Sequence, residues 1–185
     1  MSSRRLVLAL VALVAFALPT AGQAKATKRH AVKAHAAVVC ASASATPSEE
    51  SLATVRRSTL CLLNAERAKR GLKPLAPSMK LRRASERHSR AMVADRFFAH
   101  GDFFGRIKGS GYLRGVHAYT VGENIAWGGG PVASPARIVK MWMNSPPHRA
   151  NILSRTYVHI GIGVVRGTPV GMAGGTYTTD FGYRR

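Results

Sequence analysis

The sequence predicts an α+β fold in which helices come first and a pair of strands closes the chain. Apolar residues recur every three or four positions at 48–71, 78–92 and 134–145, which is the spacing of amphipathic helices. The period changes to two in residues 158–164, where Val and Ile alternate with His159, Gly161 and Gly163, as in a strand. Helices grouped before strands favour an α+β layered fold over a parallel βαβ sheet.

Capping residues mark the first two predicted helices. Ser48 is the expected N-cap of the first helix, and Glu49 and Glu50 would then occupy its first turn, where the positive helix end favours carboxylates. Gly71 is expected to end this helix, because glycine adopts the left-handed conformation of a C-terminal cap. Ser78 is the expected N-cap of the second helix.

The remaining elements are separated by glycine and proline. The glycine-punctuated stretch 101–131 predicts a long loop, of the kind that is functional or anchored by side chains. Pro135 suits the first turn of the third helix, Pro146-Pro147 end it, and a short helical turn is expected at 148–153. The turn 171–175 leads to a second strand in "TYTTDFGY". The glycines opposite the apolar face of the first strand predict that another backbone packs closely there.

The first 24 residues indicate an export signal. Arg4 and Arg5 precede an apolar run of 13 residues at 6–18, and small residues at 22–24 offer a cleavage site. The run is too short for a transmembrane helix, so a membrane anchor is the less favoured alternative. Residues 25–47 lack a periodic apolar face and predict a flexible linker, which leaves 48–185 as the folded domain. We expect a secreted protein of the cell envelope.

The chain is strongly basic. It holds 28 Lys and Arg against eight Asp and Glu, and losing the signal would leave a net charge of +18. Such a charge bears on partners rather than on fold. Outside the cytoplasm it favours anionic cell-wall polymers or a lipid surface, and export makes nucleic acid an unfavoured partner. A basic composition without a partner is the alternative, because the charges are scattered along the sequence. Nothing in the sequence predicts an oligomeric state.

Cys40 and Cys61 are the two cysteines of the chain. An even count in an exported protein predicts a disulfide, which would close a loop of about twenty residues and stabilise the fold by about 3 kcal/mol. Two free buried thiols are the alternative. The pair does not have the spacing of a four-ligand metal site.

Three residues are candidates for chemistry. His100, Glu123 and His148 lie at the edges of predicted elements, beside Gly or Pro. Two imidazoles and a carboxylate are the ligand set of an open zinc site or of a general acid–base group, although their sequence spacing is wide. His88 lies on a helical stripe, which favours a packing residue with a hydrogen bond over a catalytic one. The sequence lacks the GxSxG, HExxH and GxxxxGK[ST] motifs.

Six segments in order resemble the bacterial branch of the CAP superfamily, the SCP-like extracellular proteins related to cysteine-rich secretory proteins. They are "LLNAERAKRGLKPL", "RHSRAMVADRFFAH", "GY…VGENIAWG", "MWMNSPPHRANIL", "YVHIGIGVV" and "TYTTDFG", and they cover about 48–183. The resemblance implies a three-layer α-β-α sandwich. It also implies a cleft with two histidines and two acidic residues.

By this resemblance His100, Glu123 and His148 match the first histidine, first glutamate and second histidine of the cleft, and Asn124 and Ser145 would line it. The second glutamate has no counterpart here, because Asn144 and Ser145 stand in that region. In some members the histidines bind zinc or another divalent ion. Members are linked to sterol or lipid binding, to antimicrobial or host-interaction roles and, less firmly, to proteolysis.

Three functional hypotheses follow, and they leave open whether the protein is an enzyme. The first is a secreted, non-enzymatic binding domain that takes a small lipid-like ligand, a divalent ion or an anionic surface. The second is a zinc-assisted, protease-like hydrolase in which His100 and His148 hold the metal and Glu123 orients a ligand or acts as base. In the third, the triad is structural and Glu123 holds the loop and the histidines in place.

Overall fold

The computed structural model describes residues 40–185. The predicted signal and residues 25–39 of the predicted linker lie outside the described residues. The elements are α1 (Leu52–Ala68), β1 (Ala76–Pro77), α2 (Met79–Ala94), α3 (Phe103–Gly109), β2 (Tyr119–Gly129), the 3₁₀ turn η1 (Gly130–Ala133), α4 (Pro135–Asn144), α5 (Pro146–Leu153), β3 (His159–Arg166) and β4 (Gly174–Arg184).

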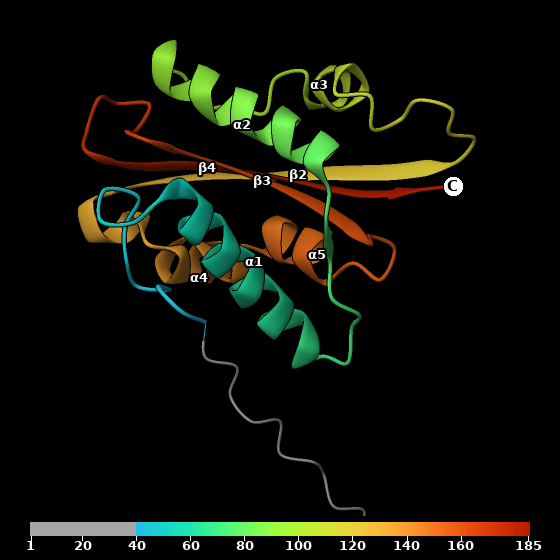
Figure 1. The fold of residues 1–185 in the computed structure, drawn as a ribbon, viewed down its shortest axis with the longest axis horizontal. Coiled ribbons are helices and arrows are strands. Elements are labelled where there is room, and N and C mark those ends of the chain that lie inside the picture. Colours follow the sequence, from blue (N-terminus) through green and yellow to red (C-terminus); the bar gives the residue numbers. More distant parts are fainter. Residues whose placement is uncertain (1–39) are drawn as a thin grey trace, which may run out of the picture. The chain divides into compact units, whose positions relative to one another are not determined.

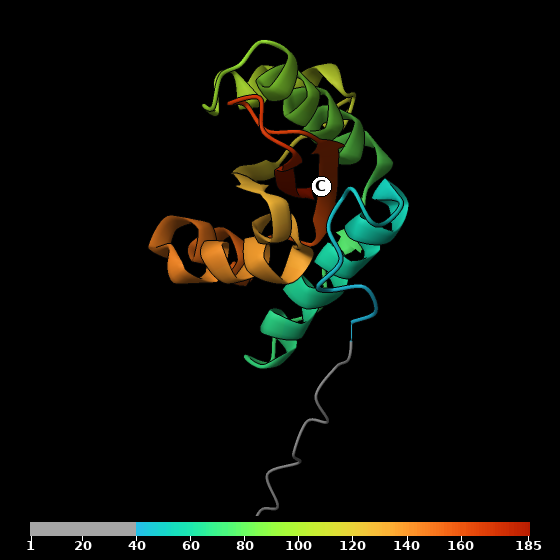
Figure 2. The same cartoon turned by 90° about the vertical axis from the view of Figure 1, so that its left-hand side faces the viewer.

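These elements form three layers. A four-stranded sheet of order β1-β3-β4-β2 lies in the middle, with β1 parallel to β3 and the other pairs antiparallel. Helices α2 and α3 cover one face, and α1, α4 and α5 cover the other (Figure 1). The view turned by 90° shows the same two helical layers on either side of the strands (Figure 2). The structure confirms the α+β class and the three-layer α-β-α sandwich.

Strand β3 shows why the two faces differ. Ile160, Ile162 and Val164 belong to the main apolar cluster, which joins the sheet to α1, α4 and α5. Gly161 and Gly163 lie on the opposite face, where an added Cβ would collide with backbone atoms of α2. The glycines therefore let the α2 backbone approach the sheet directly, and the predicted close packing is confirmed.

Helix α1 begins later than predicted. Its N-cap is Ser51, whose Oγ accepts a hydrogen bond from the Thr54 amide at 3.1 Å. Ser48 instead pairs with the Thr46 hydroxyl at 2.7 Å, and Glu49 Oε2 accepts a hydrogen bond from the Thr46 amide at 2.7 Å. Both predicted first-turn glutamates therefore precede the helix, because their segment forms a separate turn.

The predicted helix ends at Gly71 and Ser78 are confirmed. Gly71 has a φ of 65°, and the Leu72 amide donates to the Arg67 carbonyl at 3.1 Å, which is the pattern of a glycine C-terminal cap. Ser78 Oγ accepts a hydrogen bond from the Leu81 amide at 3.4 Å. Helix α4 begins at Pro135 as predicted. Helix α5 begins at Pro146, two residues before the predicted turn at 148–153, because proline is accepted in the first turn of a helix.

The prediction of one long loop over 101–131 is wrong. Asp102 caps α3 by accepting a hydrogen bond from the Gly105 amide at 2.8 Å. Strand β2 then pairs with β4 along its full length of 11 residues, from Tyr119 opposite Arg184 to Gly129 opposite Gly174. The glycines of this stretch hide the alternation of a strand, and the pairing with β4 supplies the order that local sequence does not show.

The folded domain also begins earlier than residue 48. Cys40 and Cys61 form the predicted disulfide, and the Ala136 amide on α4 donates to the Ala43 carbonyl at 2.9 Å. Pro47 is buried. Residues 40–47, predicted as linker, thus pack on the domain because the disulfide and these contacts hold them. Within 40–185, no helix has the length and apolar character needed to cross a bilayer.

Candidate binding cleft

The dipeptide Glu123-Asn124 lies on β2, the strand at one edge of the sheet. Successive side chains of a strand point to opposite faces. Glu123 contacts residues of the α2–α3 layer, and Asn124 contacts residues of α5. The dipeptide therefore contacts both helical layers at the edge of the sheet, Glu123 on one face and Asn124 on the other.

Glu123 holds the first histidine. Its Oε1 lies 2.8 Å from Nδ1 of His100, and its Oε2 accepts a hydrogen bond from Nη2 of Arg106 at 2.6 Å. The same Arg106 nitrogen also donates to the His100 carbonyl at 2.8 Å. The Glu123 side chain is 1% exposed, whereas that of His100 is 49% exposed. A buried carboxylate is thus neutralised by one guanidinium and orients an accessible imidazole.

Asn124 and Ser145 hold the second histidine. Asn124 donates to the His148 carbonyl at 3.0 Å, and Asn151 donates to the Asn124 side-chain oxygen at 2.8 Å. Ser145 Oγ lies 2.8 Å from Nδ1 of His148. The structure therefore brings all five predicted cleft residues to one edge of the sheet. It differs from our expectation in one respect, because Glu123 bonds to His100 and not to His148.

A cavity of about 260 Å³ adjoins the second histidine. Ser145 and His148 supply its polar atoms, and the remaining wall is formed mainly by apolar and aromatic side chains. It is lined by Phe98, Ile125, Ala126, Trp127, Met141, Trp142, Ser145 and His148. Both tryptophans of the chain belong to this lining. An apolar wall with few polar groups is the usual makeup of a small-molecule site.

His88 is a buried residue of α2 that contacts the backbone next to His100. It is buried, its Nε2 lies 2.9 Å from the Ala99 carbonyl, and its ring lies beside Phe97. Burial lowers the pKa of His88, whereas the charge of Glu123 raises it. The structure confirms a packing residue with a hydrogen bond, which fixes the backbone next to His100.

The environment of His148 favours its neutral form. Burial lowers the pKa of His148, and the charge of His100 lowers that pKa further. His148 is therefore neutral at neutral pH. Glu123 and Ser145 contact the Nδ1 atoms of the two rings, so their Nε2 atoms remain as the nitrogens available to a ligand.

The residues present fit a catalytic zinc site poorly. Such a site takes three protein ligands and an open position, and both Glu123 oxygens are already engaged. No group of three or more His, Cys, Asp or Glu side chains within residues 40–185 is placed to hold a metal ion. The arrangement offers two imidazole nitrogens and no third protein donor to a metal.

Asp180 is an acidic residue that the sequence reasoning missed. It is 1% exposed and lies opposite Glu123 in the β2–β4 register. Ser85 Oγ donates to its Oδ2 at 2.7 Å, while its Oδ1 has no partner within the described residues. Burial raises the pKa of Asp180 well above its usual value, and the neighbouring charge of Glu123 raises it further. A protonated Asp180 next to the Glu123–Arg106 ion pair is the arrangement that follows.

Two signals in the sequence point to the missed residues. Asp180 is the lone acid in a strand of glycine, threonine and aromatic residues, and a buried acid is unusual unless it is paired or protonated. Arg106 follows Asp102, a good N-cap, within a segment that has apolar residues at helical spacing. Asn151 has no comparable signal, because its role depends on where α5 meets β2.

Comparison with known proteins agrees with this fold. A family model described as the cysteine-rich secretory protein family, CAP, matches residues 60–179. The uncharacterized protein YkwD of Bacillus subtilis is 37% identical over 125 residues, which are 65% of this chain and 46% of that protein. The uncharacterized membrane protein YlbC of the same organism is 33% identical over 61% of this chain and 32% of its own length. The matches thus span less than half of these relatives.

Two solved structures share the fold. An extracellular protein containing a SCP domain from Bacillus anthracis superposes with a TM-score of 0.55 at 22% identity, over 71% of this chain and 43% of that chain. An outer surface protein from Borrelia burgdorferi gives a TM-score of 0.55 at 21% identity, over 67% of this chain and 88% of that chain. At these identities the likeness concerns the fold alone.

Proposed function

The chain belongs to the cysteine-rich secretory protein (CAP) family, and from that premise we propose that it is an extracellular, non-enzymatic binding domain of the cell envelope. Its cleft takes a small lipid-like ligand, and a basic helix face contacts anionic surfaces. The Cys40–Cys61 disulfide supports an oxidising compartment. The two solved structures of the same fold are those of an extracellular protein and an outer surface protein.

The observation that carries the binding function is the apolar cavity beside His148. Its polar groups, Ser145 and His148, are few and are oriented by hydrogen bonds. Both oxygens of Glu123 are engaged and its side chain is 1% exposed, so a substrate or water has little access to it as a general base. The site supports orientation of a ligand better than proton transfer.

Tryptophan fluorescence tests the cleft, because Trp127 and Trp142 are the two tryptophans of the chain and both line the cavity. Titration with decanol, a neutral fatty alcohol, should shift their emission. Met141→Asp, which places a charge in the lining, should weaken binding about tenfold, since an unpaired charge resists desolvation. Val170→Asp is the matched control at an exposed residue outside the lining. Unchanged emission, or equal weakening by both variants, would contradict the proposal.

The anionic-surface function is supported by one face of α2. Lys80, Arg83, Arg87 and Arg90 are all exposed and follow helical spacing. The opposite face of this helix is buried against the sheet, so the four cations form a stripe directed to solvent. Charges that are scattered in the sequence are thus gathered by the helix into one surface.

Sedimentation with vesicles of phosphatidylglycerol tests this stripe. Binding should fall steeply as salt rises, because exposed charges are screened. A variant with Ala at the four stripe positions should lose binding. The matched control removes four cations elsewhere on the surface, at Arg114, Arg137, Lys140 and Arg155. The proposal would be contradicted if vesicle binding did not change with salt concentration. It would also be contradicted if the stripe variant and the control variant lost binding equally.

A divalent ion is the second candidate ligand of the cleft. The observation in its favour is that the Nδ1 contacts of His100 and His148 leave both Nε2 atoms for an ion. Calorimetric titration with Zn²⁺ should show binding that His100→Ala removes and that His117→Ala, at another exposed histidine, leaves intact. Zinc-assisted hydrolysis by His100, His148 and Glu123 has weaker support, because the cleft offers the metal no third protein ligand. Absence of Zn²⁺ binding would eliminate the ion and this hydrolysis together.

A further inference from the structure

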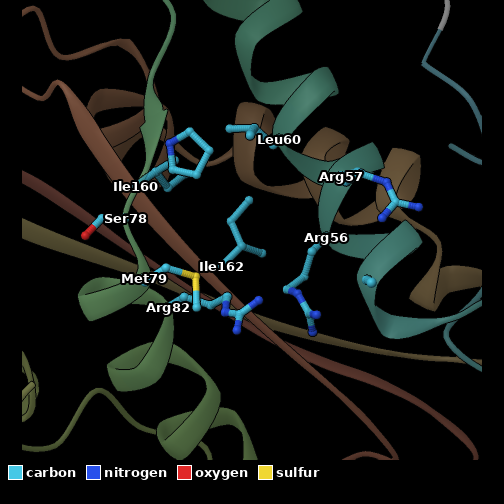
Figure 3. Close-up of a pocket in the computed structure, with 10 residues that line it drawn as sticks. Arg56, Arg57, Leu60, Ser78, Met79, Arg82, Ile160 and Ile162 are labelled. Carbon is cyan, nitrogen blue, oxygen red and sulfur yellow. The ribbon is translucent and has the colours of Figure 1, made fainter.

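The exposed aromatic side chains of residues 40–185 gather at one edge of the sheet. They are Phe98, Phe104 and Tyr119, with exposed fractions of 47%, 38% and 47%. Phe98 precedes α3, Phe104 lies on α3, and Tyr119 begins the edge strand β2. The pocket at the opposite edge of the sheet, beside β1, has no aromatic residue in its lining (Figure 3). Exposed rings gathered at one edge indicate a surface that binds a partner.

Three contacts join the segment 98–104 to β2, one ring at a time. They are the shared cavity lining of Phe98 and Trp127, the 2.8 Å contact of His100 with Glu123, and the stacking of Phe104 on Tyr119 at 5.9 Å between ring centroids. Residue numbers rise along the segment and fall along β2, so the two run antiparallel. The rings of Phe98, His100, Phe104 and Tyr119 therefore form a line, the ring row.

The length of the ring row indicates the size of its ligand. Residues of a strand advance by about 3.3 Å each, so the eight steps from residue 119 to residue 127 span about 26 Å. A ligand that fills only the cavity beside His148 would reach one end of this row. A row of this length suits an extended chain molecule.

The ring row carries no excess charge, in contrast to the whole chain. Residues 98–108 and 119–127 hold two acids and two cations, namely Asp102, Glu123, Arg106 and Lys108. Glu123 and Arg106 neutralise each other in an ion pair. An anionic polymer would gain little attraction here, whereas the cationic stripe of α2 attracts it. The row therefore suits a neutral ligand.

Polar groups accompany the rings. Nδ1 of His100 contacts Glu123, which leaves Nε2 on a side chain that is 49% exposed. Asp102 is exposed, and while its Oδ1 accepts a hydrogen bond from the Gly105 amide, Oδ2 remains as an acceptor. The Tyr119 hydroxyl adds a donor. A pyranose sugar presents C–H groups on its flat faces and hydroxyl groups at its rim, so it can use both the rings and these polar groups. An alkyl chain can use the rings alone.

We propose that the ring row binds a neutral β-1,4-linked pyranose chain. Sugar rings stack on the exposed sides of Phe98, Phe104 and Tyr119, and sugar hydroxyls bond to His100 and Asp102. The β-1,4 linkage keeps the chain straight and its ring faces open, as a linear row requires. This inference rests on the extracellular location of the proposed function, where such polymers occur. It does not require a ligand in the cavity beside His148.

Isothermal titration of the protein with chitohexaose, a neutral hexamer of β-1,4-linked N-acetylglucosamine, tests the proposal. The hexamer should bind. The dimer chitobiose should bind at least about tenfold more weakly, because it cannot reach more than one end of the row. The affinity for the hexamer should change little as salt rises, since the row has no excess charge to screen.

Variants assign the binding to the ring row. Tyr119→Ala should weaken chitohexaose binding about three- to tenfold, the value of one stacked ring. Tyr119→Phe keeps the ring and should retain most of the affinity. Met79→Ala is the matched control, because Met79 is 55% exposed and lines the pocket at the opposite edge of the sheet. It should leave affinity unchanged. Far-ultraviolet circular dichroism confirms that each variant is folded.

Several outcomes would overturn the proposal. They are absent chitohexaose binding, a dimer that binds as tightly as the hexamer, and equal affinity of the Tyr119→Ala variant and the wild type. Self-association that Tyr119→Ala abolishes in analytical ultracentrifugation would make the row an interface between copies of the chain, and would also contradict a sugar site.

The decanol titration separates this inference from the proposed function. Tyr119 lies outside the cavity lining, so Tyr119→Ala should leave the decanol response intact while it weakens chitohexaose binding. A wild-type protein that binds decanol and not chitohexaose contradicts the ring row alone. A wild-type protein that binds chitohexaose and not decanol supports the ring row and contradicts the lipid-like ligand of the cleft.

Discussion

The two faces of the sheet are built from different chemistry. Towards α1, α4 and α5 the contacts are aliphatic and aromatic, with Trp142, Tyr177 and Phe181 fully or almost fully buried. Towards α2 the sheet carries glycines, and the buried side chains include Ser85, Ser89, His88, Thr178, Asp180 and Glu123. The first face is an ordinary apolar core, and the second is a buried polar network over a close backbone contact.

This difference separates stability from function. Burial of apolar surface on the first face gives most of the favourable free energy of folding. On the second face, the short distance between α2 and the sheet excludes water from Asp180 and Glu123, which strengthens the ion pair between Glu123 and Arg106. The residues that hold the first cleft histidine thus depend on a helix that glycine allows to come close.

The largest expected effect breaks the close contact of α2. Gly163→Ala places a Cβ against the backbone of Ser85 and Glu86, which cannot move as a flexible side chain can. We expect a loss of about 3 kcal/mol or more in the free energy of unfolding, at the upper end of overpacking effects. Urea denaturation measures it. Gly109→Ala, where nothing lies within 4 Å of the added Cβ, should change stability little; equal losses would contradict the close-contact argument.

A comparable loss is expected on the apolar face. Leu63 is completely buried in the main cluster, and Leu63→Ala should cost about 3 kcal/mol through lost burial and a cavity. This loss should be the same at pH 5 and pH 8, because the only titratable groups of that apolar cluster, Tyr157 and Tyr177, have pKa values raised above the ordinary 10 by burial. Thermal unfolding at the two pH values checks it, and a strongly pH-dependent loss would show that the two faces are coupled.

A smaller effect is expected from Glu123→Gln on the polar face. The amide cannot neutralise Arg106 and holds His100 less firmly, so stability should fall by about 1–3 kcal/mol. Denaturation together with the decanol titration separates two roles for this residue. A stability loss with unchanged cleft affinity would mean that Glu123 only holds the structure. Unchanged stability would contradict the buried ion pair.

The last prediction concerns pH. The pKa of Asp180 in the folded state lies well above its ordinary value of 3.8, so the folded chain keeps a proton that the unfolded chain releases. The contribution of Asp180 to the free energy of unfolding is complete below about pH 4, the pKa of the unfolded state. It is lost in the window between that pH and the pKa of the folded state. Asp180→Asn mimics the protonated acid. The variant should therefore gain about 1.4 kcal/mol on the wild type for each pH unit in that window.

Stability curves of both proteins from pH 4 to pH 8 measure this gain. Asp95→Asn, at an exposed acid, is the control and should run parallel to the wild type. A constant difference between the Asp180→Asn variant and the wild type would mean that Asp180 is ionised in the folded protein across this range.

The sequence alone determined much of this protein. Periodicity and caps located α1, α2, α4 and α5, the terminal hairpin and the close approach at Gly161 and Gly163, because these features depend on residues near one another in the chain. The family motifs identified the three-layer fold and marked His100, Glu123 and His148. The pairing of Cys40 with Cys61 followed from the cysteine count and the expected export.

The tertiary structure decided the rest. Strand β2 is a strand because it pairs with β4, and this pairing places Glu123 opposite Asp180. The alternation of β2 sends Glu123 to one histidine and Asn124 to the other, an assignment that no local pattern contains. Which charges meet, which are buried and which lack a partner depends on elements far apart in the sequence. For that reason the cavity beside His148 and the charged groups of the cleft became visible only in the folded chain.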